Sequence, residues 1–124
     1  MRQIGIAVVG CGQWGMNYVR VLTELPEPRP IVVCDRRPQQ LSKAGTLFPG
    51  VRLCTNLEDV LASHDIDAII VGTNASEHYA VVRRCLDAGR HVLVEKPITT
   101  RVTDVEELMG AARARGLVLM VGHI

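Results

Sequence analysis

The chain has 124 residues, which suits a single domain, and 48% of them are hydrophobic while only 3% are aromatic. A core made mainly of Val, Leu, Ile and Ala is typical of parallel strands covered by helices on both faces. Fourteen basic and 13 acidic residues give a net charge of +1, so general attraction to nucleic acid is not expected. The apolar runs are far shorter than the ~20 residues of a membrane span, and the N-terminus lacks the apolar segment of a signal peptide, so no membrane partner is expected.

Strand-like and helix-like patterns alternate along the whole chain. Short aliphatic runs predict strands at residues 4–9, 31–34, 51–54, 68–71, 91–94 and 117–121. Helices are predicted between them over residues 13–25, 38–47, 55–63, 77–88 and 103–115. Capping boxes at 55–58 and 103–106 are expected to start the third and fifth of these helices. Gly89 and Gly116 are expected to end the last two helices. This order predicts an α/β fold: a three-layer, doubly wound parallel sheet of about six strands, the Rossmann fold.

The four cysteines, Cys11, Cys34, Cys54 and Cys85, are widely spaced and include no C-x-x-C pair. Neither a metal site nor a disulfide framework is expected from this spacing. Free thiols are typical of the reducing cytoplasm, which is the predicted location of the protein. Cys34, inside a predicted strand, is interpreted as a buried small apolar residue.

Unusual polar residues directly follow the predicted strands. Ligands of an open parallel sheet bind at the carboxyl ends of its strands, near the switch in strand order. The segments at that edge are 10–15, 35, 72–74, 95–97 and 122–123. We therefore expect the functional site along this one edge.

The first of these segments is a G-x-G-x-x-G sequence between a strand and a helix. Gly10 would permit the tight turn, Gly12 would let a pyrophosphate approach the backbone, and Gly15 would let the helix lie close to the strand. The helix N-terminus, with Gln13 and Trp14, would then face the anion. Trp14 either packs behind the turn, which is favoured, or borders the nicotinamide. The alternative for the whole segment is an ordinary strand-to-helix turn.

Asp35 lies 20 residues beyond Gly15, near the spacing of the acid that binds the adenosine ribose in dinucleotide-binding domains. Its carboxylate could accept hydrogen bonds from both ribose hydroxyls and would repel a 2′-phosphate, so NAD is favoured over NADP. Arg36 and Arg37 keep NADP open, because a guanidinium could hold that phosphate or stack on adenine. They could equally be a solvated surface pair.

Glu95-Lys96-Pro97 is the second site signal. A lysine at a strand end could hydrogen-bond a substrate hydroxyl and stabilise the alkoxide that develops as a hydride leaves carbon. From spacing alone, the alternative is a surface lysine in a turn. A cis Lys96–Pro97 bond is possible.

Two further edge segments carry candidate residues. Thr73 and Asn74 could line the path of a cofactor after the fourth strand, and Ser76 could cap the helix that follows. His78 is either a helix-start residue satisfied by the local backbone, which is favoured, or a group near the nicotinamide. His123 either ends the last strand or belongs to the site.

In content and order, these motifs resemble those of the Gfo/Idh/MocA oxidoreductases, relatives of glucose–fructose oxidoreductase and inositol dehydrogenase. The matching segments are 9–17, 34–35, 73–78, 95–97 and 122–123. The resemblance implies that Lys96 contacts the substrate, that the three glycines and Asp35 bind the dinucleotide, and that Thr73 and Glu95 form the cofactor-side rim. The family's usual proline after that threonine is Asn74 here, which leaves the cofactor contact of this loop open.

The same resemblance implies a longer protein. Family members continue after the Gly-His pair into a second α/β domain with a large, mostly antiparallel sheet, which supplies further catalytic residues, substrate contacts and commonly the oligomer interface. The chain would be the cofactor half of a homo-oligomeric NAD-dependent dehydrogenase, inactive or nearly so by itself. Its substrate would be a secondary alcohol of a sugar, polyol or nucleotide-linked sugar, because the Trp14-Gly15-x-Asn17 pattern resembles members that act on sugars.

Two other functions are consistent with the predicted fold. The first is a non-catalytic module that senses nucleotides, although such a module would not need Lys96. The second is a flavodoxin-like signalling domain, whose phosphate loop and acidic pocket would look different from those of this chain.

Overall fold

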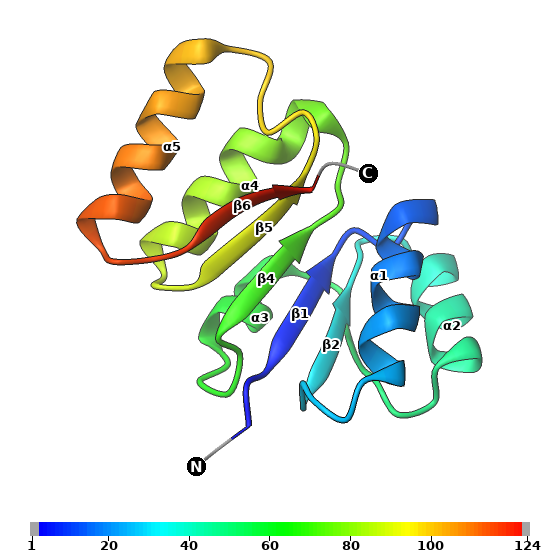
Figure 1. Ribbon diagram of the computed structural model, residues 1–124. Helices are drawn as coiled ribbons and strands as arrows, with labels where there is room; N and C mark the ends of the chain where they lie inside the picture. The colour runs from blue at the N-terminus through cyan, green and yellow to red at the C-terminus, as the bar shows by residue number, and fades with distance from the viewer. Residues whose placement is uncertain (1–2, 123–124) are drawn as a thin grey trace.

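The computed structural model describes residues 3–122, and their strands form one parallel six-stranded sheet (Figure 1). The strands are β1 (Ile6–Val9), β2 (Ile31–Cys34), β3 (Arg52–Cys54), β4 (Ala68–Val71), β5 (His91–Glu95) and β6 (Leu119–Gly122). The helices are α1 (Gln13–Glu24), α2 (Pro38–Leu47), α3 (Leu57–Ala62), α4 (Ala75–Asp87) and α5 (Val102–Ala114). The strand order β3-β2-β1-β4-β5-β6 confirms the predicted doubly wound sheet.

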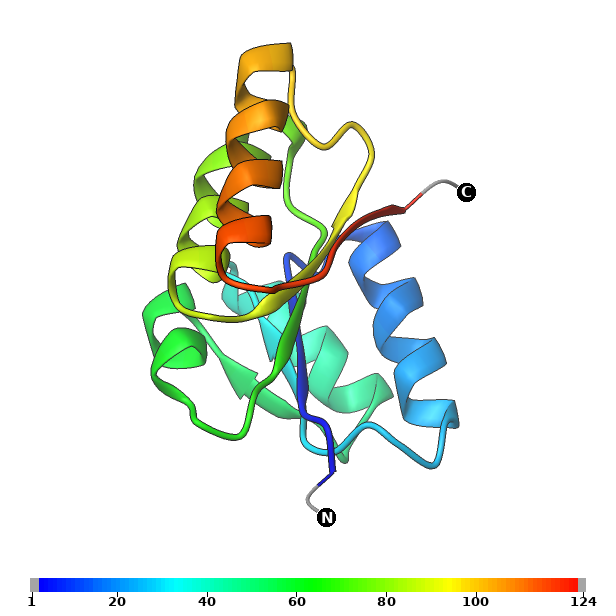
Figure 2. The same ribbon diagram turned by 60° about the vertical axis from the view of Figure 1, so that its left-hand side comes forward.

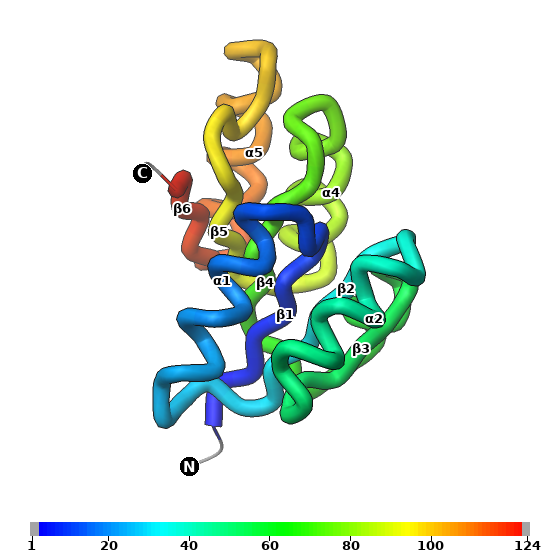
Figure 3. Tube along the Cα trace, turned by 90° about the vertical axis from the view of Figure 1, so that its right-hand side faces the viewer, coloured from blue at the N-terminus to red at the C-terminus, as the bar shows by residue number. Residues whose placement is uncertain are grey.

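Helices cover the sheet on both faces, which confirms the three predicted layers. α1 and α2 lie over one face, and α3, α4 and α5 lie over the other (Figures 1 and 2). Figure 3 views the molecule from the α1–α2 side. The central strands are buried on both faces, as the aliphatic composition predicts. The longest helices have 13 residues, so none within residues 3–122 could cross a membrane.

The strand order reverses at β1, which lies between β2 and β4. Val9, the last residue of β1, pairs with Cys34 on one side and with Val71 on the other, so the three strands end level with one another. The turn after β1 is tied to this edge, because Gly10 N donates to Cys34 O at 2.8 Å and Gly72 N donates to Val9 O at 2.8 Å. The residues that follow these three strands are therefore neighbours at the switch point, where ligands bind in such sheets.

Both predicted capping boxes are wrong. The N-cap of α3 is Asn56, whose Oδ1 accepts a hydrogen bond from Asp59 N at 2.9 Å, so the cap lies one residue beyond the predicted Thr55. Asn at this position is at least as good a cap as Thr. α5 begins at Val102 without a side-chain cap, one residue before the predicted Thr103.

The other boundaries differ by small amounts. α4 begins at Ala75, two residues earlier than predicted, so Ser76 lies inside its first turn and Asn74 occupies the N-cap position. β6 begins at Leu119 rather than at residue 117. Gly89 and Gly116 have φ values of +80° and +66°, which confirms that they end their helices in the left-handed conformation.

Candidate functional site

The glycine turn after β1 is built from backbone-to-backbone contacts that leave no space for side chains. Gly10 has φ +88°, and a Cβ there would lie 2.8 Å from the carbonyl carbon of Gly72. A Cβ at Gly15 would lie 1.9 Å from Gly10 O. Around Gly12 the space is open, since a Cβ would meet only Arg37 Nη2, at 3.9 Å. The fold therefore needs Gly10 and Gly15, whereas Gly12 leaves room beside the turn for a ligand.

The N-terminus of α1 points its positive dipole end toward this turn. Its N-cap, Gly12, provides no side-chain hydrogen bond, and the first turn of the helix contains no acidic residue. The positive partial charge is therefore not neutralised by the helix itself, which suits binding of an anion such as pyrophosphate.

Asp35, at the end of β2, is a buried carboxylate that is only 7% exposed. Its Oδ2 accepts from Cys11 N at 2.9 Å, and its two oxygens accept from Arg37 Nε at 3.0 Å and Arg37 Nη2 at 2.9 Å. Burial by itself raises the pKa of Asp35, but the hydrogen bonds from Arg37 and Cys11 outweigh it and hold that pKa well below its usual range. Asp35 is therefore an ionised acceptor beside the glycine turn, where the sequence predicts the ribose-binding acid.

The two arginines after β2 have different partners. Arg37 forms the paired contact with Asp35, whereas Arg36 Nη2 reaches Glu77 Oε1 on α4 at 2.6 Å. The sequence leaves a solvated surface pair as one option for these residues. Both side chains are solvated, with 81% and 56% of their surface exposed, and both line the cleft, each paired with a carboxylate.

A cleft of about 690 Å³ runs along the carboxyl ends of β1, β2 and β4 and is the size of a typical ligand site. Six of the predicted site residues line it, and Arg37 lies beside them: Gly10, Gly12, Asp35, Arg36, Thr73 and Asn74. The remaining wall comes from the segment after β3 and from α4, which the sequence did not point to. Thr55, which lines this wall, could have been found from its place directly after a strand.

A smaller pocket of about 180 Å³ lies beside the cleft at the end of β5. Its walls include Trp14, Thr73, His78, Glu95 and Lys96. Trp14 is 50% exposed and borders this pocket, so the favoured expectation that it packs behind the turn is wrong. The first turn of α1 directs its side chain outward because Gly15 already occupies the side that faces the sheet. Thr73 connects the two cavities, since it lines both.

The hydroxyl of Thr73 is a buried polar group with an unsatisfied hydrogen-bonding capacity among the described residues. Among the described residues, no hydrogen-bonding atom reaches Thr73 Oγ1. A buried hydroxyl without a partner costs free energy, so a polar group of a ligand in the pocket would be stabilised there.

His78 is 1% exposed and anchors the loop that carries Lys96. Its Nδ1 lies 2.6 Å from Pro97 O and its Nε2 lies 2.9 Å from Thr73 O. The favoured expectation of a histidine satisfied by backbone groups is confirmed, although one of them belongs to the segment after β5. His78 also lines the small pocket, so its ring holds together the two loops that form that pocket.

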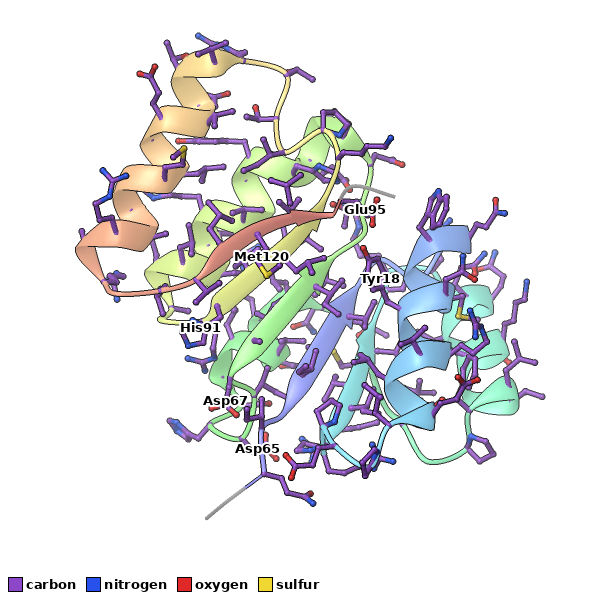
Figure 4. The ribbon with its side chains drawn as sticks, viewed as in Figure 1. Tyr18, Asp65, Asp67, His91, Glu95 and Met120 are labelled. Atoms are coloured by element: carbon purple, nitrogen blue, oxygen red, sulfur yellow. The ribbon has the colours of Figure 1, made fainter. Side chains whose placement is uncertain are left out.

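Tyr18 is a site neighbour that the sequence did not reveal. Its hydroxyl donates a hydrogen bond to Glu95 Oε1, and the two side chains point toward each other from α1 and β5 (Figure 4). Burial and then the Glu95 contact raise the pKa of Tyr18 to about 12. The spacing of four residues between Trp14 and Tyr18, which puts both on one face of α1, is the signal that could have found it.

Two of the predicted residues that the structure describes line neither cavity. Gln13 is exposed at the start of α1 and lines neither cavity within the described part of the chain. Gly15 lies behind the turn, where it permits the approach of α1. His123 falls outside the described residues. The peptide bond between Lys96 and Pro97, for which the sequence left a cis form open, is cis.

A model of an oxidoreductase family with an NAD-binding Rossmann fold, GFO/IDH/MocA, matches residues 4–123. The chain belongs to this family. Membership confirms the resemblance inferred from the motifs, and it identifies the six-stranded domain as an NAD-binding Rossmann domain.

Individual family members have been characterised or solved with nucleotides. Inositol 2-dehydrogenase of Rhodococcus erythropolis is 33% identical over 93% of this chain and 34% of its own length. The structure of GenD2 from gentamicin A biosynthesis in complex with NAD has a TM-score of 0.92 and 35% identity, over 98% of this chain and 35% of that one. KijD10, a 3-ketoreductase from Actinomadura kijaniata solved with NADP and TDP-benzene, has a TM-score of 0.89 and 31% identity, over 98% of this chain and 37% of that one.

The chain spans about a third of the length of the curated relatives it matches. The domain that it shares with them is the one that contains the glycine turn, Asp35 and Lys96.

Proposed function

We propose that this chain is the cofactor-binding domain of an NAD-dependent dehydrogenase that oxidises a secondary alcohol of a sugar, polyol or nucleotide-linked sugar. The observation that carries the proposal is the continuity of the two cavities. The cleft runs from Asp35 past the glycine turn to Thr73, and the pocket with Lys96 begins at that same threonine. An extended dinucleotide would fit this course, with its adenosine at Asp35 and its nicotinamide beside Lys96.

The described residues suit such a cofactor at three points. The buried, ionised Asp35 would accept hydrogen bonds from the adenosine ribose. The open space at Gly12 and the uncapped start of α1 would accept the pyrophosphate. The unpartnered Thr73 Oγ1 would bond a polar group near the nicotinamide. NADP remains the second choice, because Arg36 and Arg37 lie at the ribose end of the cleft.

Lys96 is the residue we propose for the reacting alcohol. When bound, the nicotinamide supplies a hydride acceptor. The exposed Lys96, at the carboxyl end of β5, would hydrogen-bond the alcohol oxygen and stabilise negative charge on it as the hydroxyl proton leaves. Both chain neighbours of this lysine are held in place, because Tyr18 contacts Glu95 and His78 contacts Pro97.

The complete enzyme requires more than these 120 described residues supply. We propose that a second α/β domain, as the family resemblance implies, provides the base that takes the proton, the remaining substrate contacts and the interface of a homo-oligomer. A cytoplasmic location is proposed from the four free cysteines.

Substitution of Lys96 tests the proposal. In the complete enzyme, Lys96→Met is expected to lower kcat/KM for the alcohol by about 10²–10⁴, the usual contribution of a proton-transfer group, while NADH affinity changes little. Lys43→Met, which alters the chain's other lysine on α2, is the matched control and should leave both values unchanged. A Lys96→Met enzyme with full activity would refute the catalytic role. Failure of the unmodified chain to bind NADH or NADPH in a nicotinamide fluorescence titration would refute the cofactor role.

A further inference from the structure

Two of the free cysteines lie side by side at the edge of the cleft. Cys34 ends β2 and Cys54 ends β3, and the two residues are direct partners in the parallel register. Neighbouring strands are about 4.8 Å apart, which falls within the Cα–Cα range of roughly 4.4–6.8 Å in disulfides. Both residues pack against the same core cluster, so their side chains lie on one face of the sheet.

The two thiols are unequal. Cys34 is buried, whereas Cys54 is half-buried and its Sγ donates a hydrogen bond to Asn56 O at 3.6 Å. The contact with the Cys34 side chain lowers the pKa of the Cys54 thiol below its usual value despite burial. The same contact, together with burial, raises the pKa of Cys34. Reactive redox cysteines combine thiolate character with access to solvent and a second thiol nearby. Cys54 is partly exposed and its lowered pKa favours the thiolate, and Cys34 is the second thiol.

Cys11 and Cys85 provide a contrast within the same chain. Both are fully buried, and burial is the main cause that raises the pKa of each thiol to about 12. Neither residue is a strand partner of another cysteine in the described register. They are therefore expected to react slowly with oxidants.

The cysteine pair is connected to the proposed ribose acceptor by the main chain. Cys34 lines the 690 Å³ cleft and directly precedes Asp35. Asp35 N donates a hydrogen bond to Cys54 O at 3.2 Å. A covalent bond between the two side chains would therefore shift the two backbone groups that position Asp35, which are the peptide bond to Cys34 and the carbonyl of Cys54.

We propose that Cys54 and Cys34 are a modification site, where a hydroperoxide forms a disulfide that weakens dinucleotide binding. The Cys54 thiolate attacks the O–O bond of hydrogen peroxide, so an S–O bond forms and hydroxide leaves. Cys34 then attacks the Cys54 sulfur; the S–S bond forms, the S–O bond breaks, and the departing hydroxide takes up the Cys34 proton. In total, two thiols lose two electrons and two protons, and one peroxide becomes two waters.

Formation of the bridge is independent of the proposed function, whereas its effect on binding rests on it. The experiment therefore has two readouts. The reduced 124-residue chain is treated with hydrogen peroxide, its remaining thiols are alkylated, and peptides are identified by mass spectrometry. NADH binding is measured by nicotinamide fluorescence before oxidation, after oxidation and after reduction with dithiothreitol.

We expect a loss of two hydrogens per chain, a peptide linked through Cys34 and Cys54, and alkylated Cys11 and Cys85. Cys54→Ser should abolish the linked peptide, and Cys85→Ala is the matched control that should retain it. Cys34→Ala, checked for folding by circular dichroism, should stop Cys54 at the sulfenic or sulfinic acid.

Oxidation is expected to weaken NADH binding by about tenfold or more, and dithiothreitol should restore it. Bridges to Cys11 or to a second chain, or a Cys54 that reacts no faster than Cys85, would overturn the proposed pair. A complete Cys34–Cys54 bridge with unchanged NADH affinity would overturn its effect on binding. If the reduced chain binds neither nucleotide, the proposed function fails, while the linked peptide still decides whether the modification site exists.

Discussion

The glycine turn allows the requirements of the fold to be separated from those of the ligand. In Gly15→Ala, the new Cβ would lie 1.9 Å from Gly10 O, where ordinary contact begins at 3.4 Å, so α1 and the turn would have to separate by about 1.5 Å. Both sides of this contact are backbone, at Gly15 and at Gly10, so no side-chain rotation can relieve the overlap. We expect a loss of about 3 kcal/mol or more, since overpacking in a tight contact costs this much at its upper end. For a domain of this size, that loss lowers the Tm by roughly 10–15 °C.

Gly12→Ala is the matched variant at the other side of the turn. Its Cβ would meet only Arg37 Nη2 at 3.9 Å, and its φ of −71° is open to any residue. The loss of stability should stay within about 1 kcal/mol, the usual cost of Ala at an N-cap. The methyl group would nevertheless occupy the approach of the pyrophosphate, so NADH affinity should fall by about tenfold or more, or 1.4 kcal/mol.

Thermal unfolding and NADH titration of both variants provide the check. If Gly15→Ala unfolds within a few degrees of the unmodified chain, the close approach of α1 to Gly10 is refuted. If Gly12→Ala binds NADH with full affinity, the turn does not hold a pyrophosphate.

Three further predictions concern charged and hydroxyl groups of the site. The pKa of Asp35 is lower in the folded chain than in the unfolded chain, so its stabilising contribution is complete above pH of about 4 and is lost as the pH falls below that value. Denaturation across this range should show that the stability advantage of the unmodified chain over Asp35→Asn shrinks as the pH falls. Tyr18→Phe should cost about 1 kcal/mol in denaturant unfolding, and it should remove the phenolate absorbance step at pH of about 12; an unchanged step would contradict the Glu95 contact. Arg37→Ala should raise NADH affinity by about fivefold, or ~1 kcal/mol, in a fluorescence titration, because the ribose would no longer have to displace the exposed guanidinium from Asp35. Weaker binding would instead indicate that the guanidinium holds the adenine.

The fold was predictable because its signals are local. Alternating aliphatic runs and helical segments predict the layers, and the turns at Gly10, Gly89 and Gly116 depend on the backbone conformation of single residues. The placement of Asp35 beside the glycine turn was also predictable, because parallel strands that follow short connections end at one edge.

The contacts within the site were not predictable, since they join residues that are far apart in the sequence. Tyr18 and Glu95 are 77 residues apart, and Cys11 and Asp35 are 24 apart. Such pairs depend on strand register and on the rotation of α1, which no local pattern specifies. Trp14 was misplaced for the same reason: the pattern shows that it is apolar, but only the contact of Gly15 with the turn decides that it faces the pocket.

The hydrogen bonds of Asp35 indicate how the cleft would accept a ribose. Its two oxygens already accept from Cys11 N, Cys11 Sγ, Arg37 N, Arg37 Nε and Arg37 Nη2, whereas a carboxylate offers about four lone-pair sites. Ribose hydroxyls must therefore displace donors that are already present. The two backbone N–H groups are fixed by the turn and by the start of α2, but the Arg37 side chain is 56% exposed and can leave. Its departure removes one donor from each oxygen and leaves three donors in place, so Oδ1 gains a free site for one ribose hydroxyl, whereas a second hydroxyl would have to displace the weak Cys11 Sγ donor, at 3.5 Å, from Oδ2. On the proposed function, Arg37 thus keeps the buried charge of Asp35 paired until the cofactor replaces it, and the released guanidinium then lies beside the adenine end of the cleft.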